Sequence, residues 1–169
     1  MTAVTPEATA EALTVLAMLE KDSTIVTAES VTGGRLAAAF TSVPGSSAHY
    51  AGGVVAYATG LKEDLLGVPR AVLDRDGAVA ATTAEAMAIG ARERLRATYG
   101  LATTGVAGPE SQEGKPIGLV YVAIAGPDRR VTERHRLAGT RQEIQSQAVL
   151  AALRLARRRL EAARRGEMG

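Results

Sequence analysis

The sequence contains no cysteine, which excludes disulfide bonds, thiolate catalysis and cysteine-ligated metal sites. Histidine occurs only at His49 and His135, and neither has neighbours at metal-ligand spacing, so we predict no metal site and structural roles for both. Tryptophan is absent, and one Phe and four Tyr are too few to supply the stacking platforms that bind single-stranded nucleic acid.

Long apolar runs are also missing. No stretch approaches the roughly 18 apolar residues that a membrane span needs. The N-terminal segment carries acidic residues where a signal peptide needs basic ones, so we expect a cytoplasmic protein with no membrane partner. The 169 residues are 46% hydrophobic and 22% charged, which is typical of a single globular domain over residues 1–169.

The net charge of +2 is unevenly distributed along the chain. Residues 154–169 hold six arginines and two glutamates, which leaves −2 for the rest of the chain. The main body is therefore not a basic surface, and we do not expect nucleic acid as a partner. The arginines are typical of a solvated helix end, where cations complement the helix dipole, although a nucleic-acid contact by this tail is the alternative interpretation.

Strand-like and helix-like segments alternate along the chain, and one pair of strands is added late in the sequence. This order predicts a single α/β domain with three α/β/α layers and a mixed, mostly parallel sheet. In such sheets ligands bind beyond the carboxyl ends of the strands, where two glycine-containing loops follow Ala28 and Thr104. The predicted strands are residues 24–28, 54–57, 101–104, 117–125 and 130–137, and the predicted helices are residues 6–22, 34–40, 62–66, 82–99 and a last one from Arg141.

The segment Glu29-Ser30-Val31-Thr32-Gly33-Gly34 places hydroxyl groups between a strand and a helix. The unpaired N–H groups of such a turn could support a serine nucleophile and an oxyanion. The alternative, which the spacing alone favours, is that Ser30 or Thr32 only caps the following helix.

Lys62 is one of only three lysines in a chain with 17 arginines. A desolvated lysine can lose its proton near neutral pH and act as a base, whereas an arginine cannot. An ion pair with Glu63 or Asp64 on a solvated helix is the alternative. Tyr57 lies shortly before Lys62 and is typical of a core residue whose hydroxyl is hydrogen-bonded.

Two further features point to a ligand. The loop of residues 104–118 fails as a phosphate-binding P-loop, because its glycines have the wrong spacing and Pro116 stands where Ser or Thr is required. Its small residues nevertheless allow the backbone to approach a ligand closely. Arg141 falls in the first turn of a helix capped by Thr140, where the dipole disfavours a cation, so we expect an anion nearby or an ion pair with Glu143 or Glu110.

Together these motifs resemble one family, the C-terminal domain of the competence-damage-inducible CinA proteins, including stand-alone nicotinamide-nucleotide amidohydrolases of the PncC type. The resemblance covers about residues 8–162. It rests on an ordered series of segments: Ala28-Glu29-Ser30, Thr32-Gly33-Gly34, Pro44-Gly45-Ser46-Ser47, Tyr57 with Lys62, Leu66-Gly67-Val68, Thr104-Gly105-Val106-Ala107-Gly108-Pro109, Lys115-Pro116-Ile117-Gly118 and Gly139-Thr140-Arg141.

The resemblance implies a dimeric α/β/α protein that hydrolyses nicotinamide mononucleotide to nicotinic acid mononucleotide and ammonia without metal or other cofactor. It implies that Ser30 is the nucleophile and Lys62 its base, with Tyr57 assisting proton return. The implied substrate-binding residues are Thr32, Gly33, Gly34, Thr104, Gly105, Ala107, Gly108 and Arg141. The alternative function is a non-catalytic, competence-associated module that binds a nucleotide or a protein.

The chain departs from the family pattern at three places. Val31 replaces a cysteine that is usual beside the serine. Glu110-Ser111 replaces a Gly-Gly pair, and Gln145 replaces an arginine. We expect the last two departures to affect substrate affinity more than the chemistry.

Overall fold

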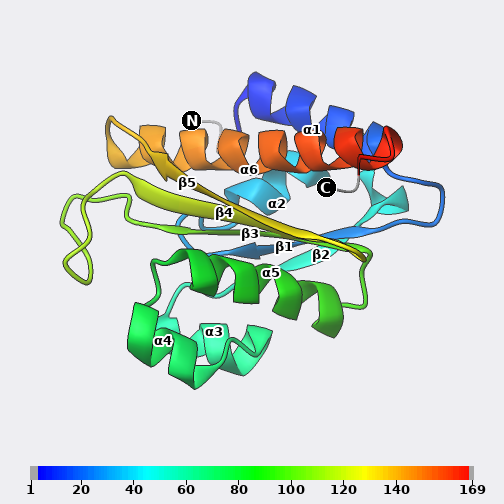
Figure 1. Ribbon diagram of the computed structural model, residues 1–169. Coiled ribbons are helices and arrows are strands. Elements are labelled where there is room, and N and C mark those ends of the chain that lie inside the picture. The colour runs from blue at the N-terminus through cyan, green and yellow to red at the C-terminus, as the bar shows by residue number, and fades with distance from the viewer. Residues whose placement is uncertain (1–3, 168–169) are drawn as a thin grey trace.

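The computed structural model describes residues 4–167, which form one α/β domain with three layers (Figure 1). A five-stranded mixed sheet separates two groups of helices, as the sequence predicts. The strands are β1 (Ile25–Glu29), β2 (Tyr50–Val55), β3 (Tyr99–Gly105), β4 (Leu119–Ala125) and β5 (Arg130–Arg136). The helices are α1 (Pro6–Met18), α2 (Arg35–Thr41), α3 (Thr59–Leu66), α4 (Arg70–Asp76), α5 (Ala81–Arg94) and α6 (Arg141–Arg164).

The strand order is β2-β1-β3-β4-β5. β1 pairs in parallel with β2 and β3, whereas β4 is antiparallel to both β3 and β5, so four strands share one direction. The carboxyl ends of β1, β2 and β3 therefore meet at one edge of the sheet. The chain leaving β5 also reaches this edge before it enters α6, which brings residues from distant parts of the sequence together there.

The two faces of the sheet differ in the size of their side chains. Toward α1, α2 and α6 the sheet presents large residues such as Ile25, Leu101 and Ile124. Toward α5 it presents mainly alanines. The small side chains let α5 approach closely, because a Cβ added at Gly100 would overlap the carbonyl oxygen of Ala88 on α5.

Helix α6 is the longest helix of the described chain and covers one face of the sheet beside α1 (Figure 1). It begins with the predicted capping box, in which Thr140 accepts from the N–H of Glu143 and Glu143 accepts from the N–H of Thr140. Several arginines at its C-terminal end are engaged with neighbouring elements: Arg154 and Arg157 with Glu11 on α1, Arg158 with Glu133 on β5, and Arg164 with carbonyl oxygens at the end of α1.

Several predicted boundaries were wrong. Helix α1 ends at Met18, four residues before the predicted end at residue 22. Helix α5 ends at Arg94 because Arg96 has a positive φ, and Leu95 is exposed. Helix α4 was not predicted from the sequence. Within residues 4–167, no helix is both long enough and apolar enough to cross a membrane.

Candidate active site

A cavity of about 310 Å³ opens at the edge where the carboxyl ends of β1, β2 and β3 meet. Its size is at the lower end of the range for small-molecule sites. Three segments supply most of its walls: the turn after β1, the chain between β2 and α3, and the loop after β3. The lining residues are Ser30, Val31, Tyr57, Ala58, Thr59, Gly105, Val106, Ala107, Gly108, Glu110, Gln112 and Arg141.

Ser30 directly follows β1, and its N–H donates to the carbonyl oxygen of Thr103 on β3. It does not cap α2, because Gly34 occupies the N-cap position without any side-chain cap. The preceding Glu29 fills that role from a fully buried position: its carboxylate accepts from the N–H groups of Leu36 and Ala37 at 2.8 and 3.0 Å. The carboxylate thus ties the end of β1 to the start of α2, which fixes the turn that carries Ser30.

Lys62 is only 1% exposed although its side chain is long and charged. Its Nζ donates to Ser30 Oγ at 3.0 Å, to the carbonyl oxygen of Ala56 at 2.8 Å and to that of Tyr57 at 3.4 Å. Burial lowers the pKa of the Lys62 ammonium from 10.5 to about 8, although the negative charge of Glu113 acts in the other direction and raises that pKa. The expected alternative, an ion pair with Glu63, is wrong, because Glu63 pairs with Arg70.

The three acceptors around Lys62 Nζ match a neutral amine as well as an ammonium. A neutral amine keeps two N–H donors, which the two carbonyl oxygens can accept. Its lone pair then faces Ser30 Oγ, along the line that the third N–H occupies in the charged form. The geometry therefore allows the serine proton to pass to Lys62 without movement of either backbone.

Arg141 reaches into the cavity from the first turn of α6. Its guanidinium donates to the carbonyl oxygen of Gly108 and, at 2.7 Å, to the hydroxyl of Tyr57. Neither Glu143 nor Glu110 forms an ion pair with it among residues 4–167. Tyr57 is 57% exposed and so is not the core residue that its sequence context indicates. The guanidinium is held by neutral partners, which leaves its charge available to an anion.

Four predicted substrate-binding residues do not line the cavity. The hydroxyl of buried Thr32 donates to Glu29 and lies 2.7 Å from that of Thr103. Thr104 points to the face of the sheet opposite to Thr103, where its hydroxyl donates to the carbonyl oxygen of Ala78. Gly33 and Gly34 shape the turn into α2 with positive φ values, and the N–H of Gly33 donates to the carbonyl oxygen of Ser30.

The loop after β3 supplies the remaining predicted residues, Gly105, Ala107 and Gly108, which all line the cavity. Within residues 4–167, no backbone carbonyl accepts from the N–H groups of Ala107 and Gly108. Thr59 and Gln112 were not predicted to belong to the site, and Glu110 was considered only as a departure from the family pattern and as a possible ion-pair partner of Arg141. Nothing in the local sequence distinguishes these three from ordinary loop residues, because only the course of the loop brings them to the cavity.

Comparison with known proteins relates the chain to one group. The family model described as the CinA C-terminal domain matches residues 7–160. A CinA-like protein from Frankia casuarinae is 51% identical over 151 residues, which are 89% of this chain and 35% of that protein. Another CinA-like protein, from Parasynechococcus marenigrum, is 47% identical over 86% of this chain and 36% of its own length. The chain thus spans about a third of the length of these curated relatives.

Solved structures agree over nearly the whole chain. The competence/damage inducible protein CihA from Agrobacterium tumefaciens superposes with a TM-score of 0.88 at 34% identity, covering 95% of this chain and 99% of that one. A competence-damaged protein (CinA) superfamily protein from Escherichia coli gives a TM-score of 0.80 at 33% identity, covering 88% and 85% of the two chains.

Proposed function

Because the chain belongs to the CinA C-terminal domain family, we propose that it is an amidohydrolase that converts nicotinamide mononucleotide to nicotinic acid mononucleotide and ammonia. One observation carries the chemistry: Ser30 Oγ and Lys62 Nζ lie 3.0 Å apart beside the cavity, and burial shifts the Lys62 pKa toward neutrality. A serine activated by a desolvated lysine is a recognised arrangement for acyl transfer.

The reaction begins with neutral Lys62, which takes the proton of Ser30 while Ser30 Oγ attacks the carboxamide carbon. The C=O π bond opens, and the resulting oxyanion is held by free backbone N–H groups, for which Ala107 and Gly108 are the candidates in this structure. Lys62 then returns the proton to the departing nitrogen, and ammonia leaves as the C–N bond breaks. Water attacks the acyl-serine next, losing its proton to Lys62, and the acid is released with Ser30 restored.

Arg141 supports the choice of a nucleotide over a simple amide. It lies in the wall of the same cavity as Ser30, and its guanidinium is the type of donor that binds a phosphate through two parallel hydrogen bonds. Tyr57, hydrogen-bonded to Arg141, orients the guanidinium through its hydroxyl. A phosphate at Arg141 and a carboxamide at Ser30 would place the ribose between them.

The reaction is expected to depend on pH through Lys62. Only the neutral amine accepts the serine proton, so kcat/KM should rise with pH as Lys62 deprotonates and level off above an apparent pKa near 8. Ammonia release measured between pH 6 and 10 at subsaturating nucleotide checks this. A flat profile, or a rate that falls as pH increases through 8, would contradict the assignment of Lys62 as the base.

The proposed function is tested by incubating the purified protein with nicotinamide mononucleotide in EDTA and measuring ammonia and the acid product, with Ser30→Ala in parallel. Release that is lost in the variant supports a serine amidohydrolase. If a folded wild type binds the nucleotide in calorimetry but releases no ammonia, the non-catalytic nucleotide-binding module is the better description.

A further inference from the structure

The loop after β3 contains a tight turn between Gln112 and Lys115. Gln112 and Lys115 exchange two backbone hydrogen bonds across it, and the two residues between them, Glu113 and Gly114, both have positive φ, at 54° and 71°. Turns of this kind favour Asn or Gly at the first central position. A glutamate is disfavoured in the left-handed region, so its side chain should provide a compensating interaction.

That interaction is with the connection between α4 and α5. The Glu113 carboxylate accepts from the N–H of Ala78 at 2.8 Å and from that of Val79 at 3.3 Å. Although burial alone raises the pKa of Glu113, these two hydrogen bonds and Lys115 bring it below its ordinary value. Gly77 makes room for the carboxylate, since a Cβ at that position would overlap Glu113 Oε2.

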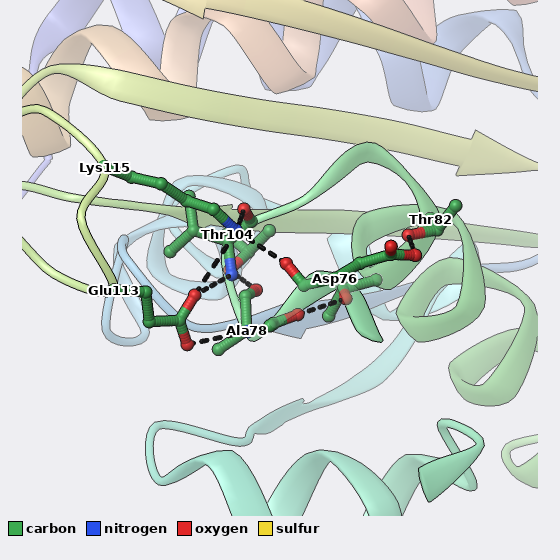
Figure 2. A network of polar contacts seen from close by, with 9 residues as sticks. Asp76, Ala78, Thr82, Thr104, Glu113 and Lys115 are labelled. Atoms are coloured by element: carbon green, nitrogen blue, oxygen red, sulfur yellow. Dashed lines mark hydrogen bonds and ion pairs between the residues drawn. The ribbon is translucent and has the colours of Figure 1, made fainter. Parts of the chain in front are cut away.

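Lys115 completes the link from the other end of the turn. Its Nζ donates to the carbonyl oxygens of Asp76, at 2.6 Å, and Val79, and it lies 3.4 Å from Glu113 Oε2 (Figure 2). Glu113 therefore accepts hydrogen bonds from the N–H groups of the α4–α5 connection, and Lys115 donates hydrogen bonds to its carbonyl oxygens. Both side chains are more than two-thirds buried, so solvent screens these contacts less than those of an ordinary surface ion pair.

The same connection is also fixed to the sheet. Thr104, next to the cavity-lining Gly105 on β3, donates to the carbonyl oxygen of Ala78 at 2.7 Å (Figure 2). The turn is thus anchored to a segment that is itself bound to the strand beneath the cavity. Glu110 and Gln112, which precede Glu113, form part of the cavity wall together with Ser30 and Arg141.

From these contacts we propose that Glu113 and Lys115 form a latch that positions the Glu110–Gln112 wall of the cavity for the substrate. Both are positioning residues, since neither lines the cavity. The proposal rests on the proposed function, because it assigns the wall to the same substrate. It separates two tasks: Ser30 and Lys62 perform the chemistry, and the latch holds the side of the cavity that closes around the remainder of the nucleotide.

The test compares Glu113→Gln and Lys115→Met with the wild type, using Glu85→Gln as a matched control. Glu85 is an exposed carboxylate on α5 that pairs with Arg130, outside the cavity. We expect each latch variant to raise KM for nicotinamide mononucleotide about tenfold, because the wall must be ordered during binding, with kcat changed less than about threefold. The control should change neither value.

A covalent probe of Ser30 shows whether the chemical machinery remains intact. An aryl sulfonyl fluoride reacts when Ser30 Oγ bonds to sulfur and fluoride leaves, with the serine proton passing to Lys62. Because the charge of Glu113 raises the pKa of Lys62, labelling is measured at about pH 9.5, where Lys62 is largely neutral with or without that charge. The rate should then stay within about twofold of wild type in both latch variants, because Ser30 and Lys62 are held by other contacts. An unchanged KM, or a labelling rate that falls as much as kcat/KM, would overturn the proposal.

Hydrogen exchange keeps the latch testable if the proposed function fails. If the wild type shows no turnover of nicotinamide mononucleotide, the reaction assignment is wrong, and exchange at the Ala78 and Val79 amides decides the latch alone. Both N–H groups are bonded to Glu113, so they should exchange at least about tenfold faster in Glu113→Gln than in wild type or in Glu85→Gln. Equal exchange in all three proteins would refute the latch.

Discussion

Replacing Lys62 with methionine is expected to lower kcat/KM for nicotinamide mononucleotide by about 10⁴-fold or more, with the fold retained. Removal of a nucleophile's base in comparable enzymes has effects of this order. Methionine matches the length of the buried lysine stem, so it fills the same space without the amine. Ammonia release and circular dichroism, measured on the same preparation, check both parts of the prediction.

The same variant should also change how stability depends on pH. In the wild type the pKa of Lys62 is about 8 when folded and 10.5 when unfolded, so the unfolded chain binds more protons between these values. Above pH 10.5 the lowered pKa of Lys62 therefore has no effect on the free energy of unfolding. As pH falls from 10.5 to 8 the free energy of unfolding decreases, and this loss is complete once pH has fallen through 8. Lys62→Met should remove that dependence and unfold at a higher denaturant concentration at pH 7.

Two controls make the Lys62 result interpretable. Lys62→Arg keeps the positive charge but cannot lose its proton, so it should be as inactive as Lys62→Met. Lys21→Met removes an exposed lysine and should leave activity unchanged. Turnover retained in Lys62→Arg would show that a neutral amine is not required and would remove Lys62 from the mechanism.

Replacing Glu29 with alanine is expected to destabilise the protein by about 4 kcal/mol. The change leaves the buried N–H of Leu36 and the N–H of Ala37 without an acceptor, and each unsatisfied buried donor costs about 1–3 kcal/mol, whereas the hydroxyl of Thr32 can still donate to that of Thr103. The turn that carries Ser30 loses its tie to α2 at the same time. Urea-induced unfolding gives the stability change, and kcat/KM of the folded fraction should fall as well.

Glu143→Ala provides the matched control for Glu29→Ala. Glu143 also accepts from a backbone N–H at a helix start, at 2.7 Å from Thr140, but in the exposed capping box of α6. Water can replace that acceptor, so the loss of stability should be clearly smaller than for Glu29→Ala. Equal destabilisation by the two substitutions would show that burial of Glu29 contributes nothing.

The sequence predicted the layers of this fold because the signals for them are local. The β-branched run before Ser30 and the capping box at Thr140 each mark an element within a few residues. Helix α4 was missed because only seven residues form it and only one of them, Leu73, is buried. A helix that short has little amphipathic pattern, and its contacts with α5 stabilise it.

Candidate site residues could be predicted where an uncommon residue type drew attention to them. They could not be predicted where only the path of the backbone brings an ordinary residue to the cavity. The rarity of lysine in this chain drew attention to Lys62, and the family resemblance supplied its expected role. The structural roles of Glu29 and Glu113 could not be predicted, because the backbone N–H groups that they accept from lie 7 and 35 residues away in the sequence. Thr104 belongs to the motif, but strand alternation turns its hydroxyl away from the cavity.

The interior has two main cores, one on each face of the sheet, and the proposed nucleotide would bind between elements that belong to different cores. Lys62 belongs to an element packed in the alanine-rich core beside α5, and Arg141 begins the helix that covers the opposite core. A nucleotide bound beside Lys62 at one end and to Arg141 at the other would connect the two sides of the domain. A bound nucleotide should therefore slow local unfolding on both sides of the sheet. Local unfolding of either side should abolish turnover before the chain as a whole unfolds.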